Sequence, residues 1–256
     1  MRFPTAILVF FCLAAPARAD FDSARASLAR GDTAEMEALA EAGDAVAQSA
    51  LATAFLVGRG VERDEKQAFA WAKKAAAAGR LEAQIMLSQL YEQGSAVEQD
   101  LAESARWLEK AAAQGDAEAQ LGLGTRYLSG AGVEKDGIVA ISWMEKAAMQ
   151  GDPVAQMQLG VVLANGAAGE TQPEAGLRWI ERAADQGYVD ALMTLGMVYV
   201  QGMFGSPDAV LAYKWFRLAA DRGEDRAIEV AHQLEGQMSP EDLARARNLV
   251  ETWTPK

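Results

Sequence analysis

The chain has 256 residues, half of them hydrophobic, and its 36 acidic against 24 basic residues give a formal net charge of −12. So much apolar sequence can build a sizeable core, whereas so acidic a surface repels phosphate backbones and argues against nucleic acid as a partner. The single histidine excludes multi-histidine zinc sites by count, and the only cysteine, Cys12, lies in a predicted signal peptide, so a mature chain without it has no Cys/His site.

Residues 1–19 have the organisation of a secretory signal peptide. Arg2 precedes an apolar run over residues 6–15, and Ala17-Arg18-Ala19 supplies the small residues of a cleavage site. The run is too short to span a bilayer, which needs roughly 20 residues. We therefore expect cleavage before Asp20, export to the periplasm or secretion from the cell, and no stable membrane insertion afterwards.

Residues 20–43 are expected to form an N-terminal cap of two short helices, over residues 21–30 and 33–42. The second helix lies one period before the repeat that follows, with Glu35 at the position of its tryptophan and Gly43 at the position of its glycine. Terminal units of a repeat array are expected to be atypical in this way.

Residues 44–223 contain a repeat whose tryptophans and glycines recur every 36 residues. A period between about 20 and 50 residues indicates a solenoid, in which each unit buries its apolar face against its neighbours. The units are residues 44–79, 80–115, 116–151, 152–187 and 188–223. The tryptophans are Trp71, Trp107, Trp143, Trp179 and Trp215, and each is followed eight residues later by Gly79, Gly115, Gly151, Gly187 or Gly223.

Each unit divides into two helices. In the third unit, Ala119, Leu123 and Tyr127 form an apolar stripe at helical spacing, and Gly130 is expected to end this first helix in the left-handed conformation. Asp136 is expected to accept amide hydrogens at the start of the second helix. On that second helix the tryptophan and an alanine pair share one face, so we expect the five tryptophans to form the structural core of the repeats, with near-complete burial of Trp143.

These residues resemble the Sel1-like repeat, a relative of the tetratricopeptide repeat with a longer loop inside the helical hairpin. The third repeat fits the pattern best. The fourth and fifth repeats depart from it in the loop, where Gly169 and Gly205 replace a valine. The resemblance covers residues 44–223 and implies an all-α, right-handed solenoid of helical hairpins. It also implies an adaptor or regulator of signalling or envelope assemblies.

Residues 224–256 are expected to form a C-terminal cap. One helix is predicted over residues 224–234, and a last helix extends from Ser239 and Pro240 to Trp253. Serine at the cap and proline at the first helical position are a typical helix start.

A partner surface is expected on the first helices, which line the concave side in tetratricopeptide-like arrays. The positions two before and two after the repeat leucine should face it, and they grow more apolar from Ser49 and Thr53 toward the C-terminus. Methionine suits surfaces that accept varied partners, although these side chains could equally pack between adjacent helices. The candidate partner-binding residues are Ile85, Leu121, Met157, Val161, Met193 and Met197.

Catalysis is difficult to place in this sequence. A serine triad would need His232, with Ser239 as the nearest nucleophile, and neither residue lies in a recognisable nucleophile turn. Paired carboxylates for glycoside cleavage depend on a separation in space that sequence does not give. We expect no enzyme activity, no cofactor and no metal.

The sequence therefore predicts an exported, non-enzymatic scaffold that binds a protein or peptide in a helical groove, for example the outer domain of a membrane sensor. The alternative is a cell-wall-directed enzyme or glycan binder acting on peptidoglycan or β-lactams. The resemblance raises that alternative because some relatives are linked to penicillin binding. Those relatives pair cysteines, and this chain has one cysteine only.

Overall fold

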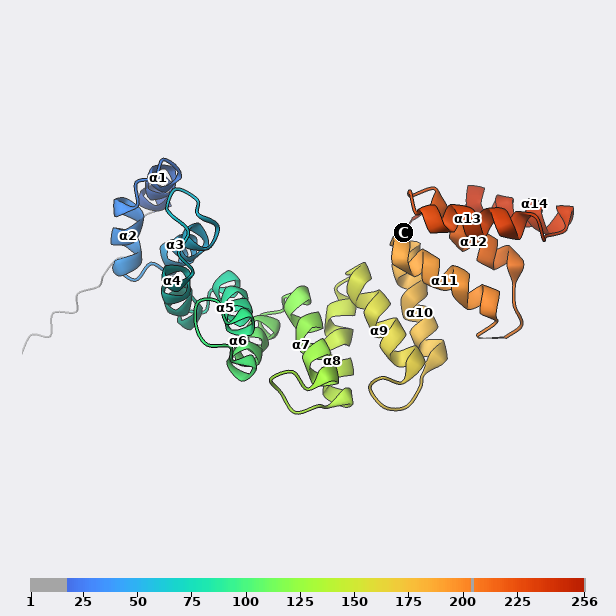
Figure 1. The fold of residues 1–256 in the computed structure, drawn as a ribbon, viewed down its shortest axis with the longest axis horizontal. Helices are drawn as coiled ribbons and strands as arrows, with labels where there is room; N and C mark the ends of the chain where they lie inside the picture. Colours follow the sequence, from blue (N-terminus) through green and yellow to red (C-terminus); the bar gives the residue numbers. More distant parts are fainter. Residues whose placement is uncertain (1–17, 204, 256) are drawn as a thin grey trace, which may run out of the picture. The chain divides into compact units, whose positions relative to one another are not determined.

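The computed structural model describes residues 18–203 and 205–255, with side chains from residue 22 onward, and in these ranges the secondary structure is helical (Figure 1). The predicted signal peptide lies almost wholly outside the described residues, so its cleavage remains a prediction. The chain divides into two compact parts, each of which is larger than a single repeat. We call residues 1–99 unit 1 and residues 100–256 unit 2, and each is described by itself.

Unit 1 contains five helices: α1 (Arg18–Ala29), α2 (Ala34–Glu41), α3 (Ala45–Val57), α4 (Glu65–Ala77) and α5 (Leu81–Gln93). The first two form the expected N-terminal hairpin, and α2 packs on α3. Met36 of α2 and Leu51 of α3 are fully buried in the core that joins them. The cap therefore supplies α3 with the apolar neighbour that a preceding repeat would otherwise provide.

Unit 2 contains nine helices within the described ranges, and they pack as successive hairpins, α7 on α8, α9 on α10 and α11 on α12. The last two helices, α13 and α14, pack on α12 and close its apolar face. The expected all-α solenoid of helical hairpins is confirmed. The bounds are α6 (Leu101–Ala113), α7 (Ala117–Ser129), α8 (Gly137–Met149), α9 (Pro153–Asn165), α10 (Pro173–Asp185), α11 (Val189–Gln201), α12 (Ala209–Ala220), α13 (Asp225–Glu235) and α14 (Pro240–Glu251).

The helix ends follow the expected chemistry. Gly130, which ends α7, is left-handed with φ of 81°, and the Asp136 carboxylate accepts the amide hydrogens of Ile138 and Val139 at the start of α8. The Ser239 hydroxyl accepts the amide hydrogen of Asp242 at the start of α14. Gln172, which replaces aspartate before α10, makes no side-chain cap, and Pro173 begins that helix instead.

The two helices of a repeat approach closely at the glycine that follows the repeat leucine. A Cβ on Gly160 would lie 2.7 Å from the backbone oxygen of Gly176, and one on Gly196 would lie 2.8 Å from the ring of Phe216. Atoms so close cannot coexist, so glycine at this position sets the distance between the helices. The residue 20 positions later, on the second helix, then fills the space beside the missing side chain.

The tryptophans differ from the expectation in their burial. Trp215 is buried, but Trp143 is only half-buried, as are Trp71, Trp107 and Trp179. A cationic side chain covers each ring, for example the Lys146 ammonium 3.6 Å from the centroid of Trp143. Lys146 lies three residues after Trp143, one turn along the same helix face, where its ammonium makes a cation–π contact and its apolar stem covers the ring.

A ladder of glutamines connects successive hairpins, and each rung pairs a buried glutamine of a first helix with an exposed glutamine at the end of the second helix. Gln120 donates from Nε2 to the carbonyl oxygen of Ala112 at 3.1 Å, and its own Oε1 accepts from Gln150 at 2.9 Å. Gln150 also donates to the carbonyl oxygen of Gly115 at 2.8 Å. The next repeat contains the same bonds between Gln156 and Gln186. Buried polar groups stabilise only when paired, so the ladder fixes how one hairpin stacks on the next.

Candidate functional site

The first helices of unit 2 contain the apolar candidates for partner binding. Met157 of α9 and Met193 of α11 are half-buried and pack against the core formed by α10 to α14. Leu121 of α7 is half-buried against the core around α8 and α9. These three positions therefore contribute to packing between helices and leave only part of each side chain at the surface.

The positions one turn further along the same helices are open. Val161 of α9 is 36% exposed and Met197 of α11 is 45% exposed. The exposed apolar surface continues with Val200, which is 39% exposed, and with Met203, which follows the end of α11 and is 60% exposed. We call Val161, Met197, Val200 and Met203 the C-terminal apolar row. Of the six residues predicted for the groove, the structure thus leaves two well exposed.

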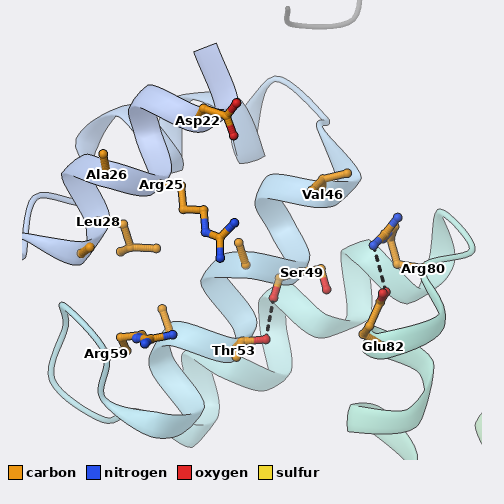
Figure 2. A pocket seen from close by; sticks show the side chains of 13 residues that line it. Asp22, Arg25, Ala26, Leu28, Val46, Ser49, Thr53, Arg59, Arg80 and Glu82 are labelled. Atoms are coloured by element: carbon orange, nitrogen blue, oxygen red, sulfur yellow. Dashed lines mark hydrogen bonds and ion pairs between the residues drawn. The ribbon is translucent and has the colours of Figure 1, made fainter. Parts of the chain in front are cut away.

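The first helices of unit 1 border a hollow of about 650 Å³ that we call the N-terminal hollow (Figure 2). Ser49 and Thr53 of α3, the polar positions that flank the repeat leucine, both line it. Ile85 of α5, the one predicted groove residue in this unit, is half-buried and is not among the residues that line the hollow. The hollow is bordered by α1, α3, Arg59 of the α3–α4 loop, and Arg80 and Glu82 at the start of α5.

The C-terminal cap contains a polar cluster that joins α12, α13 and α14. The Tyr213 hydroxyl donates to Oε1 of Glu235 at 2.6 Å, and the Arg247 guanidinium donates to the same oxygen at 3.2 Å. The hydrogen bond from Tyr213, followed by that from Arg247, lowers the pKa of Glu235. Burial, and then the bond to Glu235, raises the pKa of Tyr213. A neutral phenol therefore donates to a charged carboxylate near neutral pH, which suits a structural link.

The residues considered for catalysis have other contacts. His232 has a side chain that is 83% exposed, and its Nδ1 lies 3.9 Å from Oε2 of Glu235. The Ser239 hydroxyl is bonded to the Asp242 carboxylate at 2.9 Å, in the cap of α14. Among the described residues, no group of three or more His, Cys, Asp or Glu is placed to hold a metal ion. Nothing in these contacts activates Ser239 as a nucleophile.

The architecture defines a class of protein, a helical-repeat solenoid with exposed apolar residues on first helices of unit 2 and a hollow in unit 1. The chain belongs to the Sel1 repeat family, which matches residues 45–79, 81–116, 117–152, 153–188 and 189–224. This fold commonly mediates protein–protein interaction, and Sel1 repeat proteins are generally non-enzymatic protein-binding scaffolds. Among the described helices, none combines the length and apolar character needed to cross a membrane.

Two solved structures are similar over most of the chain. A protective antigen of uropathogenic Escherichia coli strains, displaying an SLR fold, is 28% identical with a TM-score of 0.72. The match covers 88% of this chain and 50% of the antigen, so this chain spans half of that protein's length. A Sel1 repeat protein from Oxalobacter formigenes is 30% identical with a TM-score of 0.65, over 82% of this chain and 88% of that one. Comparison with curated protein sequences found no match.

Proposed function

We propose that this protein is an exported, non-enzymatic scaffold that binds a protein or peptide partner on the first helices of unit 2, and that it serves as an adaptor for an envelope or sensor protein. The observation that carries the proposal is the C-terminal apolar row, with Val161 and Met197 at equivalent positions of adjacent repeats. Exposed apolar side chains grouped on an otherwise charged protein typically mark an interaction surface.

The half-buried methionines connect this exposed surface to the core of unit 2. Met157 and Met193 anchor in the core, while Val161 and Met197 project further toward solvent. Methionine side chains adapt their shape to different contacts. A partner helix or an extended segment could therefore pack along the strip without rearrangement of the hairpins.

Replacing Val161 and Met197 together by glutamate is expected to abolish partner binding and to leave the fold intact. Two carboxylates in the strip would have to be desolvated against an apolar partner surface. Stability should change little, because surface substitutions usually remain within about 0.5 kcal/mol. The measurement is crosslinking and mass spectrometry in the native envelope, with circular dichroism to verify helicity.

The matched control is Ile138→Glu with Met149→Glu. These residues are 82% and 73% exposed at the two ends of α8, a second helix, so this variant adds the same charge away from the strip. The control should retain the wild-type crosslinks. Equal loss in both double variants would attribute the effect to net charge, and retained crosslinks in Val161→Glu/Met197→Glu would place the binding surface elsewhere.

A further inference from the structure

The N-terminal hollow combines an apolar floor with charged walls, which contain three arginines and two carboxylates, Asp22 and Glu82. Leu28 of α1 and Ala54 of α3 are buried beneath it, at 7% and 4% exposure. Ala50 and Val46 extend this floor along α3. A volume of about 650 Å³ lies within the usual range of ligand pockets, roughly 300 to 1,000 Å³. The hollow can therefore accept a small apolar side chain together with the backbone on either side of it.

Every cationic side chain that lines the hollow is an arginine. Arg25 projects from α1 into the space beside Ser49 and Thr53 (Figure 2). Arg59 enters from the loop after α3, and both side chains are exposed to solvent. Within the described part of the chain, neither guanidinium makes a hydrogen bond or an ion pair. Both therefore present their full set of donors to an incoming ligand.

The third arginine is held in place by its own contacts. Arg80 Nη2 donates to Oε2 of Glu82 at 3.0 Å, and its Nε is buried without a hydrogen-bond partner among the described residues. Arg80 also stands where the equivalent first helices α3, α7 and α9 have an aspartate cap. The start of α5 is consequently free of a capping carboxylate on this side of the hollow.

We propose that the N-terminal hollow binds an acidic peptide segment of a protein partner, with its carboxylates on Arg25 and Arg59 and a small apolar side chain against Ala50 and Ala54. A guanidinium matches a carboxylate in a bidentate, planar pair that an ammonium cannot make. Arg80 is already paired with Glu82, so Arg25 and Arg59 against Asp22 leave the lining with a local positive charge on an otherwise acidic chain. This site is separate from the C-terminal apolar row and does not depend on what that row binds.

The test is isothermal titration of the mature full-length chain with a defined probe, an end-blocked eight-residue peptide that alternates aspartate or glutamate with alanine. Binding that weakens as salt is raised is expected, because the contacts are charged and exposed. The same peptide with asparagine and glutamine should bind at least tenfold more weakly. Equal binding of the neutral peptide would overturn the proposal.

The variant Arg25→Gln/Arg59→Gln should weaken binding of the acidic peptide at least tenfold. Its control, Arg226→Gln/Arg245→Gln, removes the same charge from exposed positions of α13 and α14 and should bind as the wild type does. Thr53→Glu adds a carboxylate to the exposed floor position and should also weaken binding. An equal loss in the control, or no loss in Arg25→Gln/Arg59→Gln, would contradict the assigned site.

Two further probes identify the anion. Inorganic phosphate and a single-stranded oligonucleotide are titrated alone and in competition with the acidic peptide. We expect that neither phosphate nor the oligonucleotide displaces the peptide when it is added at the same concentration of charge. Displacement by phosphate or by the oligonucleotide would assign the arginines to phosphate groups and reject the peptide.

Discussion

Replacing Phe216 by alanine is expected to lower the free energy of unfolding by about 3 to 5 kcal/mol, the cost of deleting a fully buried aromatic side chain. Phe216 lies on α12 with no exposed surface, in the core that joins α11, α12 and α13. Its ring also fills the space beside Gly196 of α11, where a Cβ would lie 2.8 to 2.9 Å from three ring carbons. The loss should be measured by urea denaturation followed by circular dichroism.

The reverse change tests the same contact from the other helix. Gly196→Ala should cost about 1 to 3 kcal/mol, because the added methyl group overpacks the site. The double variant Gly196→Ala/Phe216→Ala should cost less than the two single losses together, since the methyl group enters the space that the ring leaves. Unit 1 already has this combination, with Ala52 and Ala72 at the two equivalent positions and both fully buried.

The coupling free energy between Gly196→Ala and Phe216→Ala shows whether the two residues contribute to stability through their direct contact. A non-additive difference of about 0.5 to 3 kcal/mol is typical of residues in direct contact. Additive losses would show that Gly196 is required for another reason, such as backbone freedom in α11. Gly122→Ala serves as a control, because a Cβ there would meet only the Leu108 side chain at 3.4 Å, an ordinary contact, and alanine favours a helix over glycine.

Much of the fold could be predicted because the same helix-end residues recur in successive repeats. Glycine at the end of the first helix and aspartate before the second act within a few residues, so the spacing alone locates both helix ends, as at Gly130 and Asp136. The tertiary contacts depend on neighbours and were harder to predict. Trp143 is half-buried, and the Lys146 side chain covers its ring.

The candidate surfaces show the same limit. The rule that flanking positions of the repeat leucine face one side places Met197 at the surface, but it places Met193 there too, although Met193 packs partly into the core. The N-terminal hollow could not be predicted by repeat position, because Arg25 belongs to the degenerate cap and Arg59 to a loop. The glutamine ladder did carry a signal, since Gln48, Gln84, Gln120 and Gln156 recur at the repeat spacing.

Gly132→Ala is expected to lower the free energy of unfolding of unit 2 by about 2 to 5 kcal/mol, the combined cost of a left-handed alanine and of an overpacked contact. Gly132 lies in the α7–α8 loop with φ of 76°, and a Cβ there would lie 1.9 Å from the carbonyl oxygen of Leu101 at the start of α6. Backbone on both sides would have to move, because no flexible side chain is involved. The α7–α8 loop should therefore separate from the start of α6.

Gly130→Ala isolates the contact from the backbone conformation. Gly130 has nearly the same φ, 81°, in the same loop, but a Cβ there would meet nothing closer than Lys135 at 3.7 Å. It should therefore cost only the left-handed strain, about 1 to 2 kcal/mol. The excess loss in Gly132→Ala measures the docking of one repeat's loop on the helix of the repeat before it.

The next repeat makes the same loop-to-helix contact, but there the glycine lies on the helix and not in the loop. A Cβ on Gly137, at the start of α8, would lie 1.9 Å from the carbonyl oxygen of Ala168 in the α9–α10 loop. Equal losses in Gly130→Ala and Gly132→Ala, read by urea denaturation and by hydrogen exchange of the first turn of α6, would mean that the α7–α8 loop does not join adjacent repeats.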